Sequence, residues 1–340
     1  MTGTTPRGGT VQAIRVHQPG GPEALVLEDV ELPPPGPGQA LVRHTAIGVN
    51  LIDTYHRSAL TGQYAIPRPA VLGVEAAGVV EAVGPGVGTV RPGDRVAYWM
   101  LLGAYAQARL VPAERLVRLP DGVSDEVAAA AMVKGTTAQY LLHRVHPVKA
   151  GDALLVHAAA GGVGQFLCQW ASSLGATVIG TVGSPEKLAV ARAAGCEHVI
   201  LSRGEDRDGE DFVARVRDVT GGRGVDVVYD SVGQDTFLRS LDCLRPFGLM
   251  VNYGQASGPV PPFDIGVLAQ KGSLFLAKPT LATVTRTRAD IEALADGLFA
   301  ALEEGRVRVA ISRRAPLVEA AAVHRDLEAR RTTGSIVLLP

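Results

Sequence analysis

The chain has 340 residues, of which 46% are hydrophobic and 20% charged, a composition typical of a globular protein with room for two domains. Its formal net charge of -1 gives no general attraction to nucleic acid or to an acidic membrane, and no apolar run is long enough to span a bilayer. The cysteines stand apart in apolar surroundings, which argues against a disulfide framework and favours a reducing cytoplasm.

From Val11 to Leu119, short β-like runs such as VQAIRVH, AAGVVEAVG and DRVAYW alternate with turns rich in glycine and proline, which predicts a compact antiparallel domain. SDEVAAAAM predicts a helix capped by Ser124. From Asp152, apolar strands alternate with amphipathic helices, as in DALLVHA, GQFLCQWASSLG and TVIGTV, which predicts a doubly wound parallel sheet. After Pro279, the helical DIEALADGLFAALEEG and the strand SIVLLP are expected to return to the first domain.

The stretch HAAAGGVGQFLCQW joins a predicted strand to a predicted helix through a glycine-rich turn. Ala158, Gly161 and Gly164 recur in it with even spacing, and we interpret them as a dinucleotide-binding fingerprint with alanine in the first place. Gly161 would let the backbone approach a pyrophosphate, and Gly164 would let the helix pack closely on the strand. The helix N-terminus adds N–H donors and a partial positive charge. The alternative is a tight strand-to-helix turn that binds nothing.

The end of the following strand distinguishes NADPH from NADH. An NAD site carries Asp or Glu there, about 20 residues beyond the turn, to bind the ribose hydroxyls. Here the strand ends in GTVGSPEK, so that Val182, Gly183 and Ser184 occupy the place and no carboxylate is present. Ser184 and Lys187 offer a hydroxyl and a cation to a 2′-phosphate, and NADPH is therefore predicted. The alternative is that Lys187 is an ordinary solvated lysine.

Over nearly its whole length the chain resembles the zinc-free quinone oxidoreductases of the medium-chain dehydrogenase/reductase superfamily. The stretches that carry the resemblance are GGPEAL, AIGVNLIDTYHRSAL, LGVEAAGVVEAVGPGV, GDRVAY, HAAAGGVGQFLCQWASSLGATVIGTVGSPEK, VVYDSVGQDTFLRSLDCLRPFGLMVNYGQASG and QKGSLFLAKP. The resemblance implies an α/β fold with a Rossmann NADPH-binding domain at residues 133–279. It also implies a GroES-like, mainly antiparallel β substrate domain at residues 1–132 and 280–340.

No metal site is predicted. Zinc alcohol dehydrogenases of the same superfamily have a histidine before the glutamate in the region matching LGVEAAG, whereas this chain has Val74 before Glu75. His143 and His146 have helical spacing but lack the third ligand that catalytic zinc requires. A quinone needs less polarisation than an aldehyde, because hydride addition gives a delocalised hydroquinone anion, so a site without metal suits a quinone.

The resemblance implies three catalytic residues. Asn50 and Tyr55 are implied beside the nicotinamide and the acceptor, Asn50 through its amide donor and Tyr55 through its ring and hydroxyl. Thr137 is implied near the nicotinamide carboxamide, in KGTTAQYLL, which is expected to begin the helix that links the domains. Without the family, Asn50 is interpreted as a turn residue, Tyr55 as a half-buried strand residue and Thr137 as a structural residue of a helix start. Asp53 is expected to be a turn or cap residue rather than a general base.

A larger set is implied at the cofactor. Besides Asn50, it consists of Tyr140, Ala158, Gly161, Gly162, Val163, Gly164, Gly183, Ser184, Lys187, Ser202, Arg203, Ser231, Asn252, Tyr253, Lys278 and Arg330. Several of these follow predicted strands, at the edge where open α/β sheets bind ligands. Close relatives have a tyrosine at the place of Ser202, and the charge of Arg203 is expected to offset its loss. Lys278 and Arg330 could equally be solvated cations.

These features predict a cytoplasmic NADPH:quinone reductase in which hydride passes to a bound quinone and solvent or Tyr55 completes protonation. The first alternative is a zinc-free reductase of activated C=C bonds in enals, enones or enoyl thioesters. The second is a non-catalytic, crystallin-like protein that binds NADPH or RNA, and the lack of a basic stripe weighs against RNA. We expect no nucleic-acid or membrane partner. A homodimer is expected, because GSLFLAK would leave an apolar sheet edge that a second copy can cover.

Overall fold

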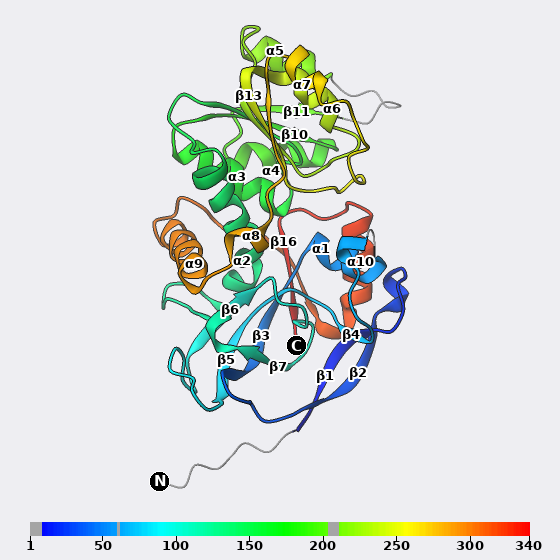
Figure 1. Ribbon diagram of the computed structural model, residues 1–340, viewed down its shortest axis with the longest axis vertical. Helices are drawn as coiled ribbons and strands as arrows, with labels where there is room; N and C mark the ends of the chain where they lie inside the picture. The colour runs from blue at the N-terminus through cyan, green and yellow to red at the C-terminus, as the bar shows by residue number, and fades with distance from the viewer. Residues whose placement is uncertain (1–8, 60–61, 203–210) are drawn as a thin grey trace. The chain divides into compact units, whose positions relative to one another are not determined.

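The computed structural model describes residues 9–59, 62–202 and 211–340, and the chain divides into two compact units (Figure 1). Unit 1 consists of Met1–Thr136, Thr285–Glu303 and Val309–Pro340. Unit 2 consists of Thr137–Val284 and Glu304–Arg308. Within the described residues, unit 1 has two sheets and unit 2 has one, and each unit has its own hydrophobic core.

Unit 1 is built mainly from antiparallel strands. In its smaller sheet, β1 (Gly9–Val16) pairs with β2 (Val26–Leu32) and β4 (Ala70–Val71). The larger sheet has the order β15 (Ile311–Pro316), β16 (Ser335–Leu339), β3 (Gln39–Val49), β5 (Glu75–Val83), β6 (Arg95–Trp99) and β8 (Val117–Arg118), and β7 (Ala108–Pro112) pairs with β3. The C-terminal strand β16 thus pairs with β3, which comes from the N-terminal part of the chain.

The helices of unit 1 include α1 (Leu51–Ser58), α9 (Arg288–Glu303) and α10 (Ala320–Glu328), while α2 (Asp125–Tyr140) begins in unit 1 and its last four residues belong to unit 2. Helices α1 and α10 pack side by side (Figure 1). The prediction that KGTTAQYLL begins a helix is wrong, because residues 134–140 are the last part of α2, which continues from the alanine-rich run, and Leu141 and Leu142 begin the π-helical turn after it. Gly135 inside α2 leaves room for Leu298 of α9, because a Cβ at this position would lie 2.4 Å from Leu298 Cδ1.

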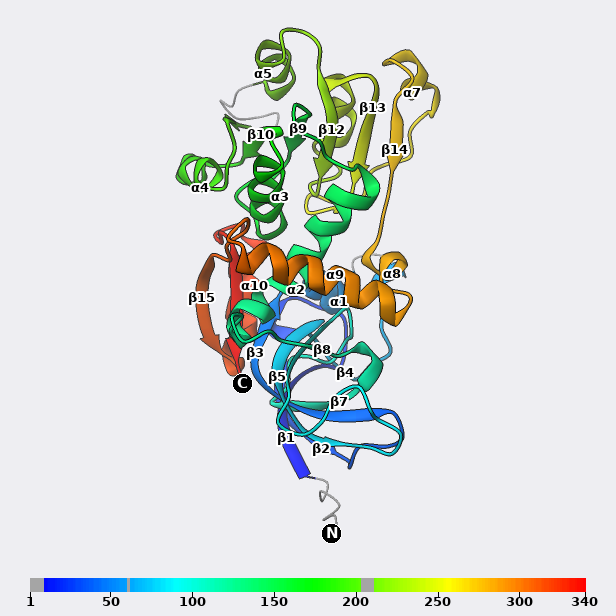
Figure 2. The ribbon, with the colours of Figure 1, turned by 90° about the vertical axis from the view of Figure 1, so that its left-hand side faces the viewer.

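Unit 2 is a parallel sheet of the doubly wound type (Figure 2). Its order is β11 (His198–Leu201), β10 (Thr177–Val182), β9 (Ala153–Val156), β12 (Val225–Asp230), β13 (Leu244–Asn252) and β14 (Phe275–Ala277). Its helices include α3 (Gly162–Ser173), α4 (Leu188–Ala193), α5 (Phe212–Val219), α6 (Phe237–Ser240), α7 (Gly266–Gln270) and α8 (Leu281–Val284). Strands β9 and β12 are buried along their whole length, as expected of a sheet covered on both faces.

The strand order reverses between β9 and β12. From β9 the chain moves outward to β10 and β11, and it then returns to β12 and moves outward in the other direction to β13 and β14. The connections after β9 and β12 therefore leave the sheet in opposite directions. In open α/β sheets such a switch point, at the carboxyl ends of the strands, is where ligands bind.

Candidate functional site

The glycine-rich turn lies at this switch point, between β9 and α3. Ala158, in the place of the first fingerprint glycine, has a φ of +53°, a conformation that glycine adopts more easily. Gly161 is the N-cap of α3 and has no capping side chain, so the first amide groups of the helix are available to an anion. At Gly164 a Cβ would lie 2.3 Å from Ala158 O, which explains why only glycine fits. Gly162 and Val163 are the first two residues of α3 and lie between Gly161 and Gly164.

Val182, Gly183 and Ser184, where β10 ends, carry no carboxylate, and the first acidic residue beyond them is Glu186. Gly183 is exposed, and a Cβ built on it would meet no atom within 4 Å. Ser184 precedes a short 3-10 turn, Pro185–Lys187, and Lys187 is its last residue. Ser202 follows β11 at the same edge, whereas Arg203 lies outside the described residues. The chain thus presents open backbone, a hydroxyl and an ammonium group where an NAD site would present a carboxylate.

The ends of β12, β13 and β14 bring a second group of predicted residues to the same edge. Ser231 follows β12, and Asn252 ends β13 directly before Tyr253. Lys278 follows β14 and donates a hydrogen bond from Nζ to Asn252 Oδ1. Burial lowers the pKa of Lys278 and raises that of Tyr253. Lys278 is therefore held by a hydrogen bond to Asn252 and is not a freely solvated cation.

Other predicted residues lie elsewhere in the two units. Thr137 and Tyr140 are buried in the last turns of α2, within unit 2, and burial raises the pKa of Tyr140. Arg330 belongs to unit 1, is exposed, and has a φ of +57°. Tyr55 lies on α1 of unit 1, half-buried, with its ring 5.0 Å from that of Tyr64 between centroids. Tyr55 is thus a helix residue, and its interpretation as a strand residue is wrong.

Asn50 lies at the junction of β3 and α1 and is buried in a polar cluster. Its Nδ2 donates to Glu75 Oε1 at 2.7 Å, and its Oδ1 accepts from Lys134 Nζ at 2.9 Å. Lys134 Nζ also donates to Glu75 Oε1 at 3.2 Å, and Val133 N donates to Glu75 Oε2 at 2.6 Å. The carboxylate, the ammonium group and the amide therefore neutralise and satisfy one another inside unit 1.

A directed chain of hydrogen bonds begins at Asp53, three residues into α1. Asp53 Oδ2 accepts from Asn50 N at 2.8 Å, as expected of a cap residue, and from the Tyr105 hydroxyl at 3.0 Å. Tyr105 also contacts His324 Nε2 at 3.0 Å, and His324 Nδ1 lies 3.0 Å from Arg57 Nη1. Because a guanidinium only donates, His324 Nδ1 must accept and Nε2 must donate. Burial raises the pKa of Asp53 to about 7 and lowers that of His324 to about 3.

The candidate metal-ligand histidines are engaged by other groups. His143 lies in the π-helical turn Leu141–Val145, edge-on to Trp170 with 5.3 Å between ring centroids. His146 ends that turn and contacts Asp152 at 3.2 Å. Across residues 9–59, 62–202 and 211–340, no group of three or more His, Cys, Asp or Glu side chains is placed to hold a metal ion. In the same part of the chain no helix is both long and apolar enough to cross a membrane.

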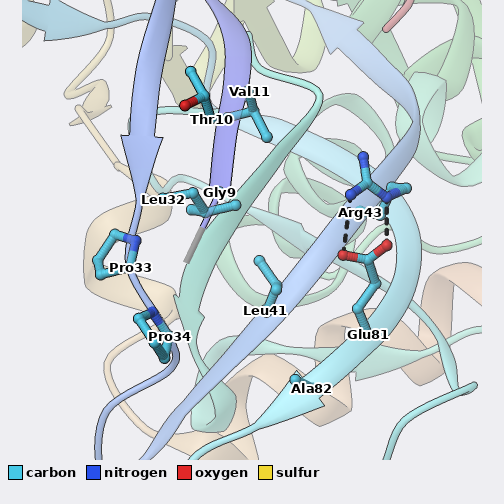
Figure 3. Close-up of a pocket in the computed structure, with 10 residues that line it drawn as sticks. All are labelled: Gly9, Thr10, Val11, Leu32, Pro33, Pro34, Leu41, Arg43, Glu81 and Ala82. Carbon is cyan, nitrogen blue, oxygen red and sulfur yellow. Dashed lines mark hydrogen bonds and ion pairs between the residues drawn. The ribbon is translucent and has the colours of Figure 1, made fainter. Parts of the chain in front are cut away.

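A surface pocket of unit 1 contains none of the predicted site residues. It lies between β1, β2, β3 and β5, where Arg43 and Glu81 form a two-pronged ion pair (Figure 3). Apolar side chains such as Leu32, Pro33 and Leu41 complete its lining. Since Arg43 and Glu81 neutralise each other, the lining of this pocket offers no unpaired charge to a cofactor phosphate.

Sequence reasoning missed Lys134 and the buried chain from Tyr105 through His324 to Arg57. A lysine inside the apolar run VAAAAMVKG is itself a signal, because a lysine that faces a core needs an acidic partner. Its partner, Glu75, stands in the equally apolar LGVEAAG. Nothing in the spacing of the two residues identifies them as a pair.

Comparisons with known proteins agree with this architecture. The family model described as "Alcohol dehydrogenase GroES-like domain" matches residues 36–121, and that described as "Zinc-binding dehydrogenase" matches residues 162–296. A quinone oxidoreductase of Pseudomonas aeruginosa is 50% identical over 94% of this chain and 97% of that protein. A 2-haloacrylate reductase of a Burkholderia species is 48% identical over 97% of this chain and 99% of that protein. The crystal structure of Escherichia coli quinone oxidoreductase complexed with NADPH is 44% identical, with a TM-score of 0.90, over 97% of this chain and 100% of that one.

Proposed function

The chain belongs to the quinone oxidoreductase family of the medium-chain dehydrogenase/reductase superfamily, and on that premise we propose that it is an NADPH-dependent quinone reductase. The observation that carries the proposal is the carboxyl edge of the unit 2 sheet. There a glycine turn exposes helix-start amides, and the end of β10 has Ser184 and Lys187 in place of a carboxylate. This set fits a dinucleotide with an additional phosphate on its adenosine ribose.

Each part of the edge has a distinct task. The amides that begin α3 hold the pyrophosphate, and Gly161 lets it approach. Ser184 and Lys187 hold the 2′-phosphate, and Ser231, Asn252, Tyr253 and Lys278 line the path toward the nicotinamide. The bound cofactor supplies the hydride. Thr137, Tyr140 and Arg330 are also proposed to contact the cofactor. In this proposal residues 133–279 form the cofactor-binding domain, and residues 1–132 and 280–340 form the substrate domain.

Asn50 and Tyr55 serve the acceptor in this proposal. An N–H of the Asn50 amide stabilises the oxygen on which negative charge develops as hydride arrives. A tyrosine hydroxyl is protonated at physiological pH and burial raises the pKa of Tyr55 further, so this hydroxyl offers a hydrogen bond to the product anion. The reaction is proposed to need no zinc, because Val74 occupies the place of a ligand histidine and both oxygens of Glu75 accept hydrogen bonds within the protein.

Steady-state assays test this function directly. Turnover of NADPH with benzoquinone is expected, with a marked preference over NADH, in protein freed of metal by chelation. Reduction of 2-haloacrylates or alkenals is the second candidate activity, which the Burkholderia relative favours. Faster turnover of 2-haloacrylate than of any quinone would replace the first proposal by the second.

Lys187→Glu is expected to weaken NADPH binding about 10- to 100-fold, because it replaces an attraction to the 2′-phosphate by a repulsion. NADH lacks that phosphate, so its affinity is expected to change less than about 3-fold. Fluorescence titration of both nucleotides measures the two effects. Lys149→Glu, an exposed lysine of the same unit, is the matched control. Equal losses for NADPH and NADH would contradict the assignment of Lys187 to the 2′-phosphate.

We also propose that the protein is a cytoplasmic homodimer paired through β14. This strand is the edge of the unit 2 sheet, drawn in gold in Figure 2, and Phe275 and Leu276 on it are 57% and 40% exposed. A second copy would cover these side chains and satisfy the edge. The cytoplasmic location is supported by the free, buried thiols of Cys168, Cys196 and Cys243.

Phe275→Asp is expected to convert the dimer to a monomer at micromolar concentration, because a carboxylate buried in the pairing would lack a partner. Light scattering coupled to size exclusion measures the mass. Val318→Asp alters an equally exposed apolar residue of unit 1 and is expected to leave the dimer intact. A monomeric unmodified protein, or a dimeric Phe275→Asp variant, would argue against this interface.

A further inference from the structure

Lys134 and Glu75 form a buried ion pair to which the proposed reaction assigns no task. Their side chains are 7% and 0% exposed. The Lys134 ammonium group donates to Glu75 Oε1, to Val49 O at 3.1 Å and to Asn50 Oδ1. An ammonium group has three N–H donors, and all three are engaged here. Lys134 therefore has no proton to offer a ligand, and any influence on the reaction must pass through its neighbours.

The pair holds both ends of the Asn50 amide. Glu75 accepts from Nδ2, and Lys134 donates to Oδ1. A flipped amide would direct its NH₂ group at the ammonium and its oxygen at the carboxylate, so that both contacts would become repulsive. The backbone is held as well, because Asn50 N donates to Asp53 Oδ2 and Asn50 O accepts from Asp53 N at 3.0 Å. Only one orientation of the amide satisfies these partners.

We infer that Lys134 and Glu75 are positioning residues, which fix the Asn50 amide so that its second N–H donates to the acceptor substrate. The inference rests on the proposed function, in which Asn50 touches the acceptor. Nδ2 carries two protons, and the bond to Glu75 uses one of them. A donor that is already oriented needs no reorganisation when charge develops on the substrate, and this is the main requirement for electrostatic stabilisation of a transition state.

The orientation of the amide can be tested without turnover. The asparagines of this chain are Asn50 and Asn252, so isotope-labelled asparagine yields the side-chain signals of these residues alone in NMR spectra, and Asn50→Ala assigns them. The paired variant Glu75→Gln/Lys134→Met removes both charges together and so leaves no lone buried charge. We expect it to speed hydrogen exchange of the Asn50 amide at least about 10-fold. Asn252, whose Oδ1 is held by Lys278, serves as the internal reference and should not change. An Asn50 amide that exchanges equally slowly in the folded paired variant would overturn the inference.

A double-mutant cycle tests the effect on catalysis. With NADPH and benzoquinone, the paired variant is expected to lower kcat about 10-fold while KM for NADPH changes less than about 2-fold. In an Asn50→Ala background the same two substitutions should lower kcat less than about 2-fold, because the residue through which they act is gone. Equal losses in both backgrounds would reject the positioning role. If no quinone supports NADPH oxidation by the unmodified protein, the proposed function fails. The NMR result would still decide how Asn50 is held.

Discussion

Lys134→Met is expected to lower the free energy of unfolding of unit 1 by about 3–5 kcal/mol near pH 7, the range found when one partner of a buried ion pair is removed. Methionine fills much of the same volume but donates no hydrogen bond. Glu75 would remain buried with Asn50 Nδ2 and Val133 N as its donors. Among the described residues it would then have no cation within 4 Å to neutralise its charge. Val49 O and Asn50 Oδ1 would each lose a donor as well.

Urea unfolding can measure this loss in unit 1 alone. The two tryptophans are Trp99 in unit 1 and Trp170 in unit 2, so a Trp170→Phe background makes the fluorescence report on unit 1. Arg91→Met, which alters a cation of unit 1 whose side chain is 82% exposed, is the control and should change stability by less than about 0.5 kcal/mol. Adding Glu75→Gln to Lys134→Met should restore a large share of the loss, because the lone charge is then removed. A loss below about 1 kcal/mol would show that the cluster is hydrated or rearranges.

The parts of the site that could be predicted are those formed by neighbours in sequence. The turn from Ala158 to Gly164 and the end of β10 are local, and their strand–turn–helix context is visible in the residue pattern. The parallel sheet was predictable for the same reason, since its strands and helices alternate without interruption.

The Asn50 cluster could not be predicted in this way, because it is made by contacts between distant segments. Glu75 comes from β5 and Lys134 from α2, and they meet Asn50 only because β3 pairs with β5 and the end of β3 lies against α2. The wrong start assigned to the helix at Lys134 had the same origin. The residue pattern around Lys134 does not show that Leu298 of α9 occupies the space that Gly135 leaves, and that α2 therefore continues through this position.

Asp53→Asn is expected to make the stability of unit 1 rise with pH between about pH 4 and pH 6.5. Burial raises the pKa of Asp53 from 3.8 to about 7, so between these values the folded chain holds a proton that the unfolded chain has released. The contribution of this proton is fully present below the unfolded pKa and is lost as the pH rises through the folded pKa. A shift of about three pKa units corresponds to about 4 kcal/mol. Relative to Asp53→Asn, the unmodified protein should lose that amount between about pH 4 and pH 7.

His324, two hydrogen bonds away from Asp53, has the opposite dependence. Burial and Arg57 lower its pKa from 6.5 to about 3, so in this range the unfolded chain binds the additional proton and stability falls as the pH falls. The two shifts nearly cancel in the unmodified protein, and each single variant exposes the other. Stability of Asp53→Asn should rise from about pH 4 to pH 6.5, and that of His324→Gln should fall, each measured by urea unfolding as a difference from the unmodified protein. The difference also cancels the contribution of His44, whose pKa burial lowers to about 4. Parallel pH profiles for the unmodified protein and both variants would mean that neither group titrates as its burial requires.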